Sequence, residues 1–340
     1  MKSLKEYAMN ITEQDYHRYP AWSYSKIARY ARGGFQALST LDQPIEQTPE
    51  IRFGSLVDTM ITRGKSEFMN RYVVSDEPLP TPAKKAVIDN ILARTSVPFS
   101  EIPDSIYKAA FDECDYQKNY SFEKKIQSLQ SCYEYYTLKT SGKEVISSAD
   151  YADARAMMMA IRNDNYLKDI FGVKNTDGKE YLYQLQLLSN IEVNDKTYPV
   201  KCMFDLLIVD HKNKTLQGVD LKTSHMPGYD FWTDHFVKMR YDIEAQVYTA
   251  VLQETIKNTD YKSYTILPYL FTDICRTDKV PVTYSYNVTE NPEFKFKNYT
   301  YKNWRSLLAE IDGYQENHAV VPSYIRTDGP NDILELLNNH

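Results

Sequence analysis

The chain has 340 residues and a formal net charge of −6, with 42% hydrophobic and 25% charged residues. These proportions exclude wholesale disorder, collagen-like repeats and long coiled coils. The negative charge disfavours a protein that coats nucleic acid through a broad basic surface, but it is compatible with a local groove for DNA. Because no apolar run reaches the roughly 18 residues of a membrane span and the N-terminus lacks the apolar core of a signal peptide, we expect a cytoplasmic protein with no membrane partner.

Helical patterning covers the chain up to about residue 61. A polar, proline-containing stretch over 76–104 predicts a loop with one short helix, and mixed helical patterning follows over 105–140. Ser147 lies three positions before Asp150, a capping-box signature that predicts a helix over 149–163.

After residue 163 the spacing of the apolar residues changes from the helical to the strand period. Strands are predicted at 181–188, 198–209, 216–222, 265–271 and 280–288, and helices at 229–257 and 301–317. The last helix should bury an apolar stripe made of Trp304, Leu307, Leu308 and Ile311. This order predicts an α/β fold with a central mixed β-sheet flanked by helices.

The most informative segment is 199–222, where two apolar strands flank the polar stretch DHKNKT. A two-residue turn at Lys212 and Asn213 would make an antiparallel hairpin in which Asp205 lies opposite Asp220 on one face. Lys222 shares the face of Asp220, because side chains alternate along a strand. Two adjacent carboxylates in an apolar hairpin repel each other unless a divalent cation neutralises them, so we expect a site for Mg²⁺ or Mn²⁺.

Such a metal lowers the pKa of a bound water and polarises a phosphodiester, while Lys222 can orient the water and stabilise the transition state. The alternative is a surface hairpin with a charged outer face, since acid-x-Lys triplets recur in this chain, for example at Glu123 and Lys125. The acids of the hairpin lie in otherwise apolar runs, which favours the metal site.

An upstream Asp205 followed by a strand bearing Asp220-x-Lys222 resembles the signature of the PD-(D/E)XK nuclease superfamily. The chain is similar in particular to the exonuclease domain of RecE-type phage recombination proteins, which are lambda-exonuclease-like. The similarity covers roughly residues 20–257 and rests on segments in the same order, namely SYSKIARYARGGFQAL, RFGSLVDTMITRGKSEFMNRYVV, GKEVISSADYADARAMMMAIRND, VKCMFDLLIVD with GVDLKTS, and MRYDIEAQVYTAVL.

This resemblance implies a restriction-endonuclease-like core over 146–340 with a catalytic hairpin at 199–222. An N-terminal helical region over 1–145 would contribute one active-site helix at about 51–64, and the whole would form one compact unit. The implied catalytic residues are Asp205, Asp220 and Lys222, and the implied ligands of one or two Mg²⁺ or Mn²⁺ ions are Asp58, Asp205 and Asp220. DNA binding or support of the active site is implied for Arg240, Tyr241, Gln246, Gln186 and Lys201.

The sequence departs from the family pattern at several positions. Asp58 stands where the family usually has a metal-binding His, and Phe204 replaces the Pro of the motif. Gln184 and Gln186 lie in the strand that often carries a Glu. The final 60 residues contain no cysteine, so we expect no iron–sulfur cluster of the kind that some relatives carry.

The resemblance implies a metal-dependent DNA exonuclease that resects linear duplex ends from 5′ to 3′ in phage-type recombination, in the cytoplasm of a bacterial or phage-infected bacterial cell. It also suggests a single-strand annealing protein as partner and a ring-shaped homo-oligomer. Two alternatives stay open: a catalytically degenerate relative that binds DNA or a partner protein, and a defence-type endonuclease. The glutamine substitutions favour the first of these, and the intact Asp205, Asp220 and Lys222 count against it.

Overall fold

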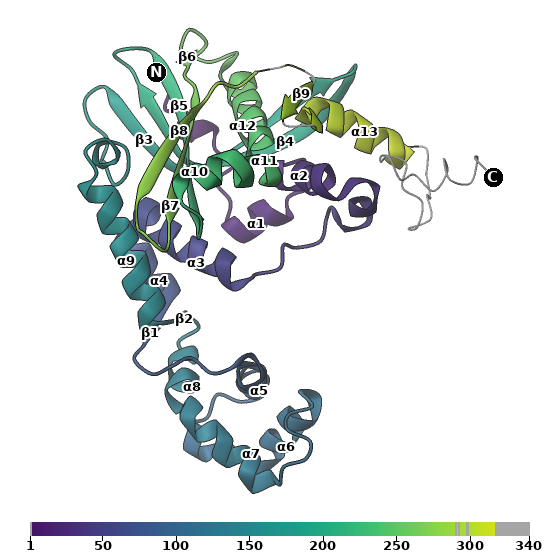
Figure 1. Ribbon diagram of the computed structural model, residues 1–340, viewed down its shortest axis with the longest axis vertical. Coiled ribbons are helices and arrows are strands. Elements are labelled where there is room, and N and C mark those ends of the chain that lie inside the picture. The colour runs from purple at the N-terminus through teal and green to yellow at the C-terminus, as the bar shows by residue number, and fades with distance from the viewer. Residues whose placement is uncertain (1, 290, 292, 297–298, 317–340) are drawn as a thin grey trace, which may run out of the picture. The chain divides into compact units, whose positions relative to one another are not determined.

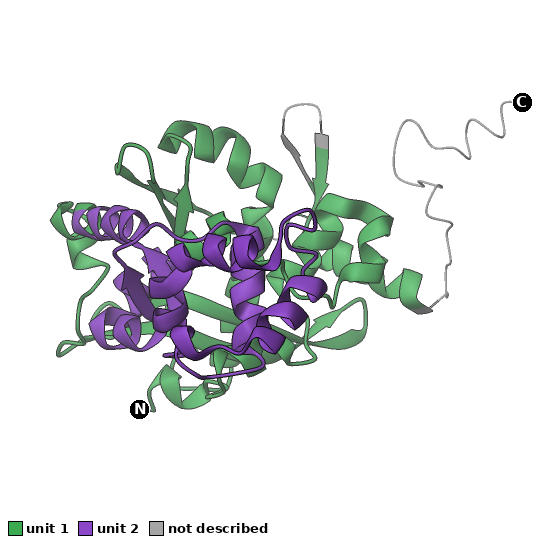
Figure 2. Ribbon diagram, turned by 90° about the horizontal axis from the view of Figure 1, so that it is seen from below, with its two compact units in different colours: residues 1–54, 160–340 green, residues 55–159 purple. Residues whose placement is uncertain are grey.

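The computed structural model describes residues 2–289, 291, 293–296 and 299–316, and the chain forms two compact units. Unit 1 comprises residues 1–54 and 160–340, and unit 2 comprises residues 55–159 (Figure 2). The expected boundary was a single one at residue 145. The division differs because the chain leaves unit 1, builds a helical module with a core of its own, and then returns.

Unit 1 is built on a mixed β-sheet with the strand order β3-β4-β5-β7-β8, in which the short β6 also pairs with β5. The strands are β3 (Lys179–Val193), β4 (Lys196–Asp210), β5 (Thr215–Ser224), β6 (Thr265–Ile266), β7 (Tyr269–Cys275) and β8 (Pro281–Tyr286). β5 and β7 are parallel, whereas β3–β4, β4–β5 and β7–β8 are antiparallel. The predicted α/β class, with a mixed sheet flanked by helices, is confirmed.

Helices of unit 1 pack against this sheet. α2, α11 and α12 lie together against one face (Figure 1), and α12 contacts β3, β4 and β5. Because α12 also contacts α2 and α13, most of its residues are buried, polar ones included. The helices of this unit are α1 (Glu13–Arg18), α2 (Tyr24–Gly33), α10 (Gly228–Asp230), α11 (Phe236–Met239), α12 (Tyr241–Ile256) and α13 (Trp304–Glu316), with a π-helical turn at Phe231–His235.

The C-terminal part of unit 1 contains an unpredicted hairpin and a predicted helix. The hairpin pairs β9 (Glu293–Phe296) with β10 (Tyr299–Lys302). The apolar stripe of α13 is buried as expected, with 0% to 5% exposure at Trp304, Leu307, Leu308 and Ile311. None of the described helices is both long and apolar enough to pass through a bilayer.

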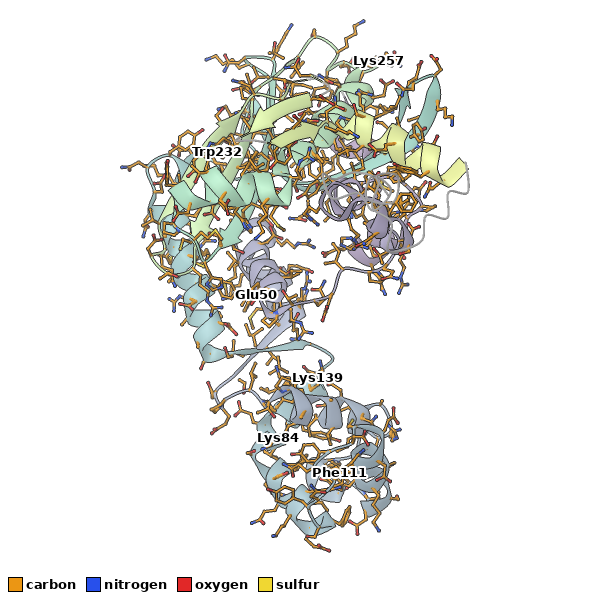
Figure 3. The ribbon with its side chains drawn as sticks, turned by 45° about the vertical axis from the view of Figure 1, so that its right-hand side comes forward. Glu50, Lys84, Phe111, Lys139, Trp232 and Lys257 are labelled. Atoms are coloured by element: carbon orange, nitrogen blue, oxygen red, sulfur yellow. The ribbon has the colours of Figure 1, made fainter. Side chains whose placement is uncertain are left out.

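Unit 2 is helical, with one pair of short parallel strands, β1 (Tyr72–Ser75) and β2 (Glu144–Ser147). Phe111 is 3% exposed in its core (Figure 3). The Ser147 hydroxyl accepts a hydrogen bond from the Asp150 N–H at 3.0 Å, which confirms the predicted cap. The helices of this unit are α4 (Gly64–Arg71), α5 (Pro82–Leu92), α6 (Asp104–Glu113), α7 (Phe122–Leu129) and α8 (Tyr133–Lys139), and α3 (Pro49–Asp58) and α9 (Ser148–Asn163) have residues in both units.

Gly218 on β5 lies under two aromatic rings. A Cβ atom added there would lie 2.5 Å from Cε2 of Tyr269 and 3.0 Å from Cε1 of Phe204. Both rings are fully buried, so neither can move aside cheaply. We expect Gly218→Ala to lower the free energy of unfolding by about 1–3 kcal/mol in urea denaturation. Gly313→Ala is the control, because a Cβ atom there meets nothing within 4 Å, and equal stability of the two variants would contradict the expectation.

Candidate active site

The β4–β5 hairpin has the register that the sequence predicts. Leu206 pairs with Val219, and the same register places Asp205 level with Asp220. The β4–β5 ladder ends at Leu206–Val219, one position before Asp205 and Asp220, and β5 continues along β7 alone. Oδ2 of Asp205 accepts a hydrogen bond from the Leu221 N–H at 2.9 Å. The Asp205 carboxylate therefore bridges the two strands at the point where they separate.

Lys222 lies between two buried carboxylates. Its Nζ is 2.7 Å from Oδ2 of Asp220 and 2.8 Å from Oε2 of Glu244, which belongs to α12. Asp220 is 3% exposed and Glu244 is 4% exposed. The structure thus brings Asp220 and Lys222 together as expected. With Asp220 buried and only 16% of the Lys222 side chain exposed, they do not form a charged outer face of a surface hairpin.

Burial and charge shift the pKa values of this cluster. Burial alone would lower the pKa of Lys222, but the carboxylates of Asp220 and Glu244 outweigh it and hold that pKa well above its usual value. Burial, reinforced by the Asp220 charge, raises the pKa of Glu244 to about 8. Two carboxylates beside one ammonium leave the cluster with an excess of negative charge, which a bound cation or a proton on Glu244 would offset.

Aromatic side chains enclose the Lys222 ammonium. Its Nζ lies 4.4 Å from the centre of the Tyr241 ring, within the range of a cation–π interaction. Burial is the main cause that raises the pKa of Tyr241 to about 12. Tyr24 of α2 packs near Tyr241 and donates a hydrogen bond to the Met239 carbonyl at 3.1 Å. Tyr241, one of the residues implied to support the active site, is therefore part of the cluster.

Glu244 was missed by the sequence analysis, which selected Gln246 on the same helix. The two residues differ by about 200° around the helix axis, so they point to opposite sides of α12. Oε1 of Gln246 accepts a hydrogen bond from the Trp304 N–H at 3.4 Å, in a pocket of about 260 Å³ next to α13. Gln246 therefore lies outside the Lys222 cluster, and its implied role in DNA binding or support of the active site stays a prediction. The sequence did contain one indication of Glu244: it lies three residues after Tyr241 and therefore on the same face of the helix.

Arg240 does not have the exposure that a phosphate contact requires. It is 4% exposed, and its Nε and Nη2 each donate a hydrogen bond of 3.0 Å to the Asp242 carboxylate. Nη2 also donates to the Lys302 carbonyl at 2.6 Å. With φ at 62°, Arg240 forms the junction between α11 and α12. This guanidinium therefore fixes the start of α12 to β10, and the implied role of Arg240 in DNA binding or support of the active site stays a prediction.

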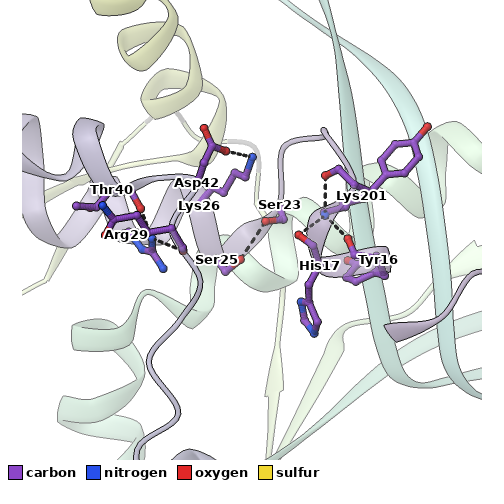
Figure 4. A network of polar contacts seen from close by, with 11 residues as sticks. Tyr16, His17, Ser23, Ser25, Lys26, Arg29, Thr40, Asp42 and Lys201 are labelled. Carbon is purple, nitrogen blue, oxygen red and sulfur yellow. Dashed lines mark hydrogen bonds and ion pairs between the residues drawn. The ribbon is translucent and has the colours of Figure 1, made fainter. Parts of the chain in front are cut away.

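Lys201 is a structural residue in unit 1. It is 2% exposed, and its ammonium donates hydrogen bonds to the carbonyls of Tyr16, His17 and Tyr19 at the end of α1 (Figure 4). Burial lowers the pKa of Lys201 to about 8. Gln186 pairs with Met203 in the β3–β4 ladder, and its Nε2 lies 3.9 Å from the Met203 sulfur. The hydrogen bonds of Lys201 and Gln186 all lie within unit 1 and do not bear on DNA binding. The implied DNA contacts of both residues stay predictions.

Asp58, the implied replacement for a metal-binding His, is the last residue of α3 and belongs to unit 2. Its Oδ1 accepts a hydrogen bond from the Thr62 hydroxyl at 2.9 Å, and its Oδ2 lies 3.7 Å from Nε of Arg63. The carboxylate is thus engaged within its own unit. Its role as a metal ligand stays a prediction.

The chemistry of the cluster suits a hard divalent cation, because its possible ligands are carboxylate oxygens with an excess of negative charge. Among the residues that the structure describes, however, no three His, Cys, Asp or Glu side chains surround one point so as to hold a metal ion. Asp220 and Glu244 instead share the Lys222 ammonium. Asp205 is the next candidate for a third ligand. It lies level with Asp220 in the hairpin register, and its carboxylate is bonded to the Leu221 N–H.

Comparison with known proteins does not assign a family. No protein-family model matches the chain, and no curated protein matches it. A crystal structure of SSO0001 is 12% identical and covers 58% of this chain and 72% of that chain, with a TM-score of 0.27. Similarity at that level establishes neither a shared fold nor a shared function.

Proposed function

We propose that unit 1 is a metal-dependent nuclease with a PD-(D/E)XK core that hydrolyses phosphodiester bonds in DNA. The observation that carries the proposal is the Lys222 ammonium held between the buried carboxylates of Asp220 and Glu244. Burying three charges is a poor way to stabilise a fold, because well-packed apolar side chains are often as stable or more so. Buried titratable groups with shifted pKa values are typical of functional sites.

The sheet supports the same proposal. The hairpin of β4 and β5 is followed by α12, which crosses over to the parallel strand β7. This path places Glu244 of α12 above Asp220 and Lys222 of β5. Asp205 of β4 completes the group, because its carboxylate is bonded to the backbone of β5 next to Asp220.

Each side chain has a defined part in the proposed reaction. A bound Mg²⁺ or Mn²⁺ would supply a Lewis acid and a water of lowered pKa. Asp220 and Glu244, with Asp205, are the carboxylates that would hold it. Lys222 stabilises the negative charge that develops on the phosphoryl oxygens of the substrate. The Tyr241 ring keeps water from the ammonium, which strengthens its electrostatic effect.

The substrate that we propose is the end of a linear DNA duplex, resected from 5′ to 3′, as the resemblance to RecE-type exonucleases implies. A single-strand annealing protein and a ring-shaped homo-oligomer belong to the same proposal.

Digestion of linear duplex DNA tests the proposal. We expect Mg²⁺ or Mn²⁺ to support hydrolysis by the wild-type protein, EDTA to stop it, and Lys222→Ala to lower its rate by about 10²–10³-fold. Lys212→Ala is the matched control, because Lys212 is exposed in the turn of the same hairpin. Equal rates for Lys222→Ala and the wild type would remove this site from the chemistry. Cleavage of covalently closed plasmid, which has no ends, would show an endonuclease and contradict a strictly end-dependent exonuclease.

A second candidate is a degenerate relative that binds DNA without cutting it. The observation in its favour is that no complete three-residue metal site is assembled among the described residues. Duplex binding in a gel-shift assay, combined with the absence of hydrolysis across millimolar Mg²⁺ and Mn²⁺, would favour this candidate over the nuclease.

A further inference from the structure

A pocket of about 260 Å³ lies in unit 1 between α12 and the start of α13. Gln246, Thr249 and Gln253 of α12 line it, together with residues 303–305 of α13 and its cap. These positions of α12 recur every three or four residues, so they form one face of the helix. Because Gln246 points away from the side of Glu244, the pocket is separate from the Lys222 cluster.

The lining offers many hydrogen-bonding groups but a single charge. None of its described residues is acidic, and the one charged residue is Arg305. Apolar side chains of 266–268 and Val288 form another part of the wall, and a mixture of apolar surface with a few polar groups is typical of small-molecule sites. The polar groups are amides and hydroxyls of Gln246, Gln253, Asn287, Asn303, Thr249 and Thr289. A fitting ligand therefore presents hydrogen-bond donors and acceptors and carries no positive charge.

Thr249 brings a buried polar group to this pocket. The residue is 8% exposed, and among the described residues its hydroxyl has no hydrogen-bond partner. The hydroxyl of Thr255 on the same helix, by contrast, donates to the Val251 carbonyl at 2.7 Å. Buried hydroxyls are normally paired, because an unpaired one costs free energy. The Thr249 hydroxyl therefore indicates a ligand that completes its hydrogen bonding.

Positive charge lies at the α13 end of the pocket. Arg305 belongs to the first turn of α13, where the helix dipole is positive. Its Nη1 donates a hydrogen bond to the Glu192 carbonyl at 3.0 Å, and its guanidinium lies 4.6 Å from the centre of the Trp304 ring. These two contacts hold the planar group in place and leave it further N–H donors. Such donors suit the oxygens of a phosphate or carboxylate.

We propose that this pocket binds a nucleoside monophosphate, with the phosphate at Arg305 and the base at the amides of Gln253 and Asn287. Asn and Gln amides match the edge of a base, which offers donors and acceptors side by side. The pocket is smaller than the roughly 300–1,000 Å³ of most ligand sites, so it suits one nucleotide and not an oligonucleotide. The choice of a nucleotide rests on the proposed function, because an exonuclease releases such molecules from DNA. The preference for a small anion rests on the pocket alone.

Calorimetric titration of dAMP into the full chain in EDTA tests the proposal. EDTA prevents metal-dependent hydrolysis and keeps divalent ions away from the Lys222 cluster. We expect dAMP to bind with a Kd below about 1 mM, a modest affinity for a small ligand. Deoxyadenosine lacks the phosphate and inorganic phosphate lacks the base, so each should bind at least about tenfold more weakly. Equal affinity for dAMP and inorganic phosphate would overturn the assignment to a nucleotide.

Substitutions in the lining locate the binding. Arg305→Met should raise the Kd for dAMP by at least about tenfold, because it removes charge-assisted hydrogen bonds and keeps the apolar stem over Trp304. Arg305→Lys should retain part of the affinity, since the charge remains. Gln253→Ala changes an exposed residue and should raise the Kd by about threefold. If Arg305→Met does not fold, Gln253→Ala still tests the pocket.

Lys257→Met is the matched control. It also removes a positive charge, but Lys257 is exposed just after α12 and does not line the pocket. The Kd for dAMP should therefore stay at the wild-type value. Equal Kd values for the wild type, Arg305→Met and Gln253→Ala, or no binding of dAMP at all, would overturn the proposal.

The two proposals can fail separately. If dAMP binds and Arg305→Met weakens the binding while the wild-type protein cuts no DNA, the nucleotide pocket stands and the proposed function fails. If the protein digests DNA but dAMP does not bind in EDTA, the pocket inference fails alone.

Discussion

Replacing Lys222 with methionine is expected to lower the free energy of unfolding by about 3–5 kcal/mol at pH 8, the cost of removing one partner from a buried ion pair. Methionine keeps much of the shape of the side chain, so packing changes little. The loss arises because Asp220 and Glu244, both nearly fully buried, then have no cation between them. Urea denaturation at 25 °C measures it, and Lys212→Met in the exposed turn is the control.

A second substitution should restore much of this stability. Glu244→Gln removes one of the two charges that Lys222→Met leaves unpaired, so the double variant is expected to be more stable than the single one. The double-mutant cycle then yields a coupling free energy between positions 222 and 244. Additive effects of the two substitutions would show that the 2.8 Å contact between Nζ and Oε2 contributes nothing.

The defect of Lys222→Met should also depend on pH. The pKa of Glu244 is about 8 in the folded protein and about 4.3 in an unfolded chain. The folded state therefore binds more protons between these values, and stability falls as the pH rises through them. Without Lys222 the pKa of Glu244 rises further. The difference in stability between variant and wild type is thus expected to grow from pH 6 to pH 9, and a constant difference would contradict this account.

The parts of this site that follow local rules could be predicted from the sequence. Strand alternation and a tight turn are enough to place Asp205 level with Asp220, and to place Lys222 beside it. Glu244 could not be found in that way, because its contact with Lys222 depends on how α12 crosses the sheet. The rotation of α12 about its own axis likewise decides that Glu244, and not Gln246, faces the strand.

Other features depend on backbone conformations that leave no clear mark in the sequence. Arg240 adopts a left-handed φ of 62° at the junction of two helices, a conformation usually expected of Gly or Asn. Gln184 has the same kind of conformation inside a strand. Helical patterning up to residue 61, over 105–140 and over 149–163 was visible, but it did not reveal that the segment 55–159 has a core of its own.

A second buried carboxyl group lies on the strand next to Lys222. Asp273 of β7 pairs in register with Lys222 and is 0% exposed. Its Oδ2 accepts a hydrogen bond from the Ser224 hydroxyl at 3.0 Å, whereas Oδ1 has no hydrogen-bond partner among the described residues. Burial raises the pKa of Asp273 to about 7, although the hydrogen bond from Ser224 opposes the shift.

Asp273→Asn is therefore expected to stabilise the protein at high pH only. The pKa of Asp273 is about 7 in the folded state and about 3.9 in an unfolded chain, so stability falls by up to roughly 4 kcal/mol as the pH rises through this window. Asn carries no charge and keeps the shape, so the variant should gain up to that amount at pH 9 and almost nothing at pH 4. Urea denaturation at both pH values measures this, with the exposed Asp177→Asn as control. An equal gain at both pH values would mean that packing, and not the charge of a buried carboxylate, limits stability at this position.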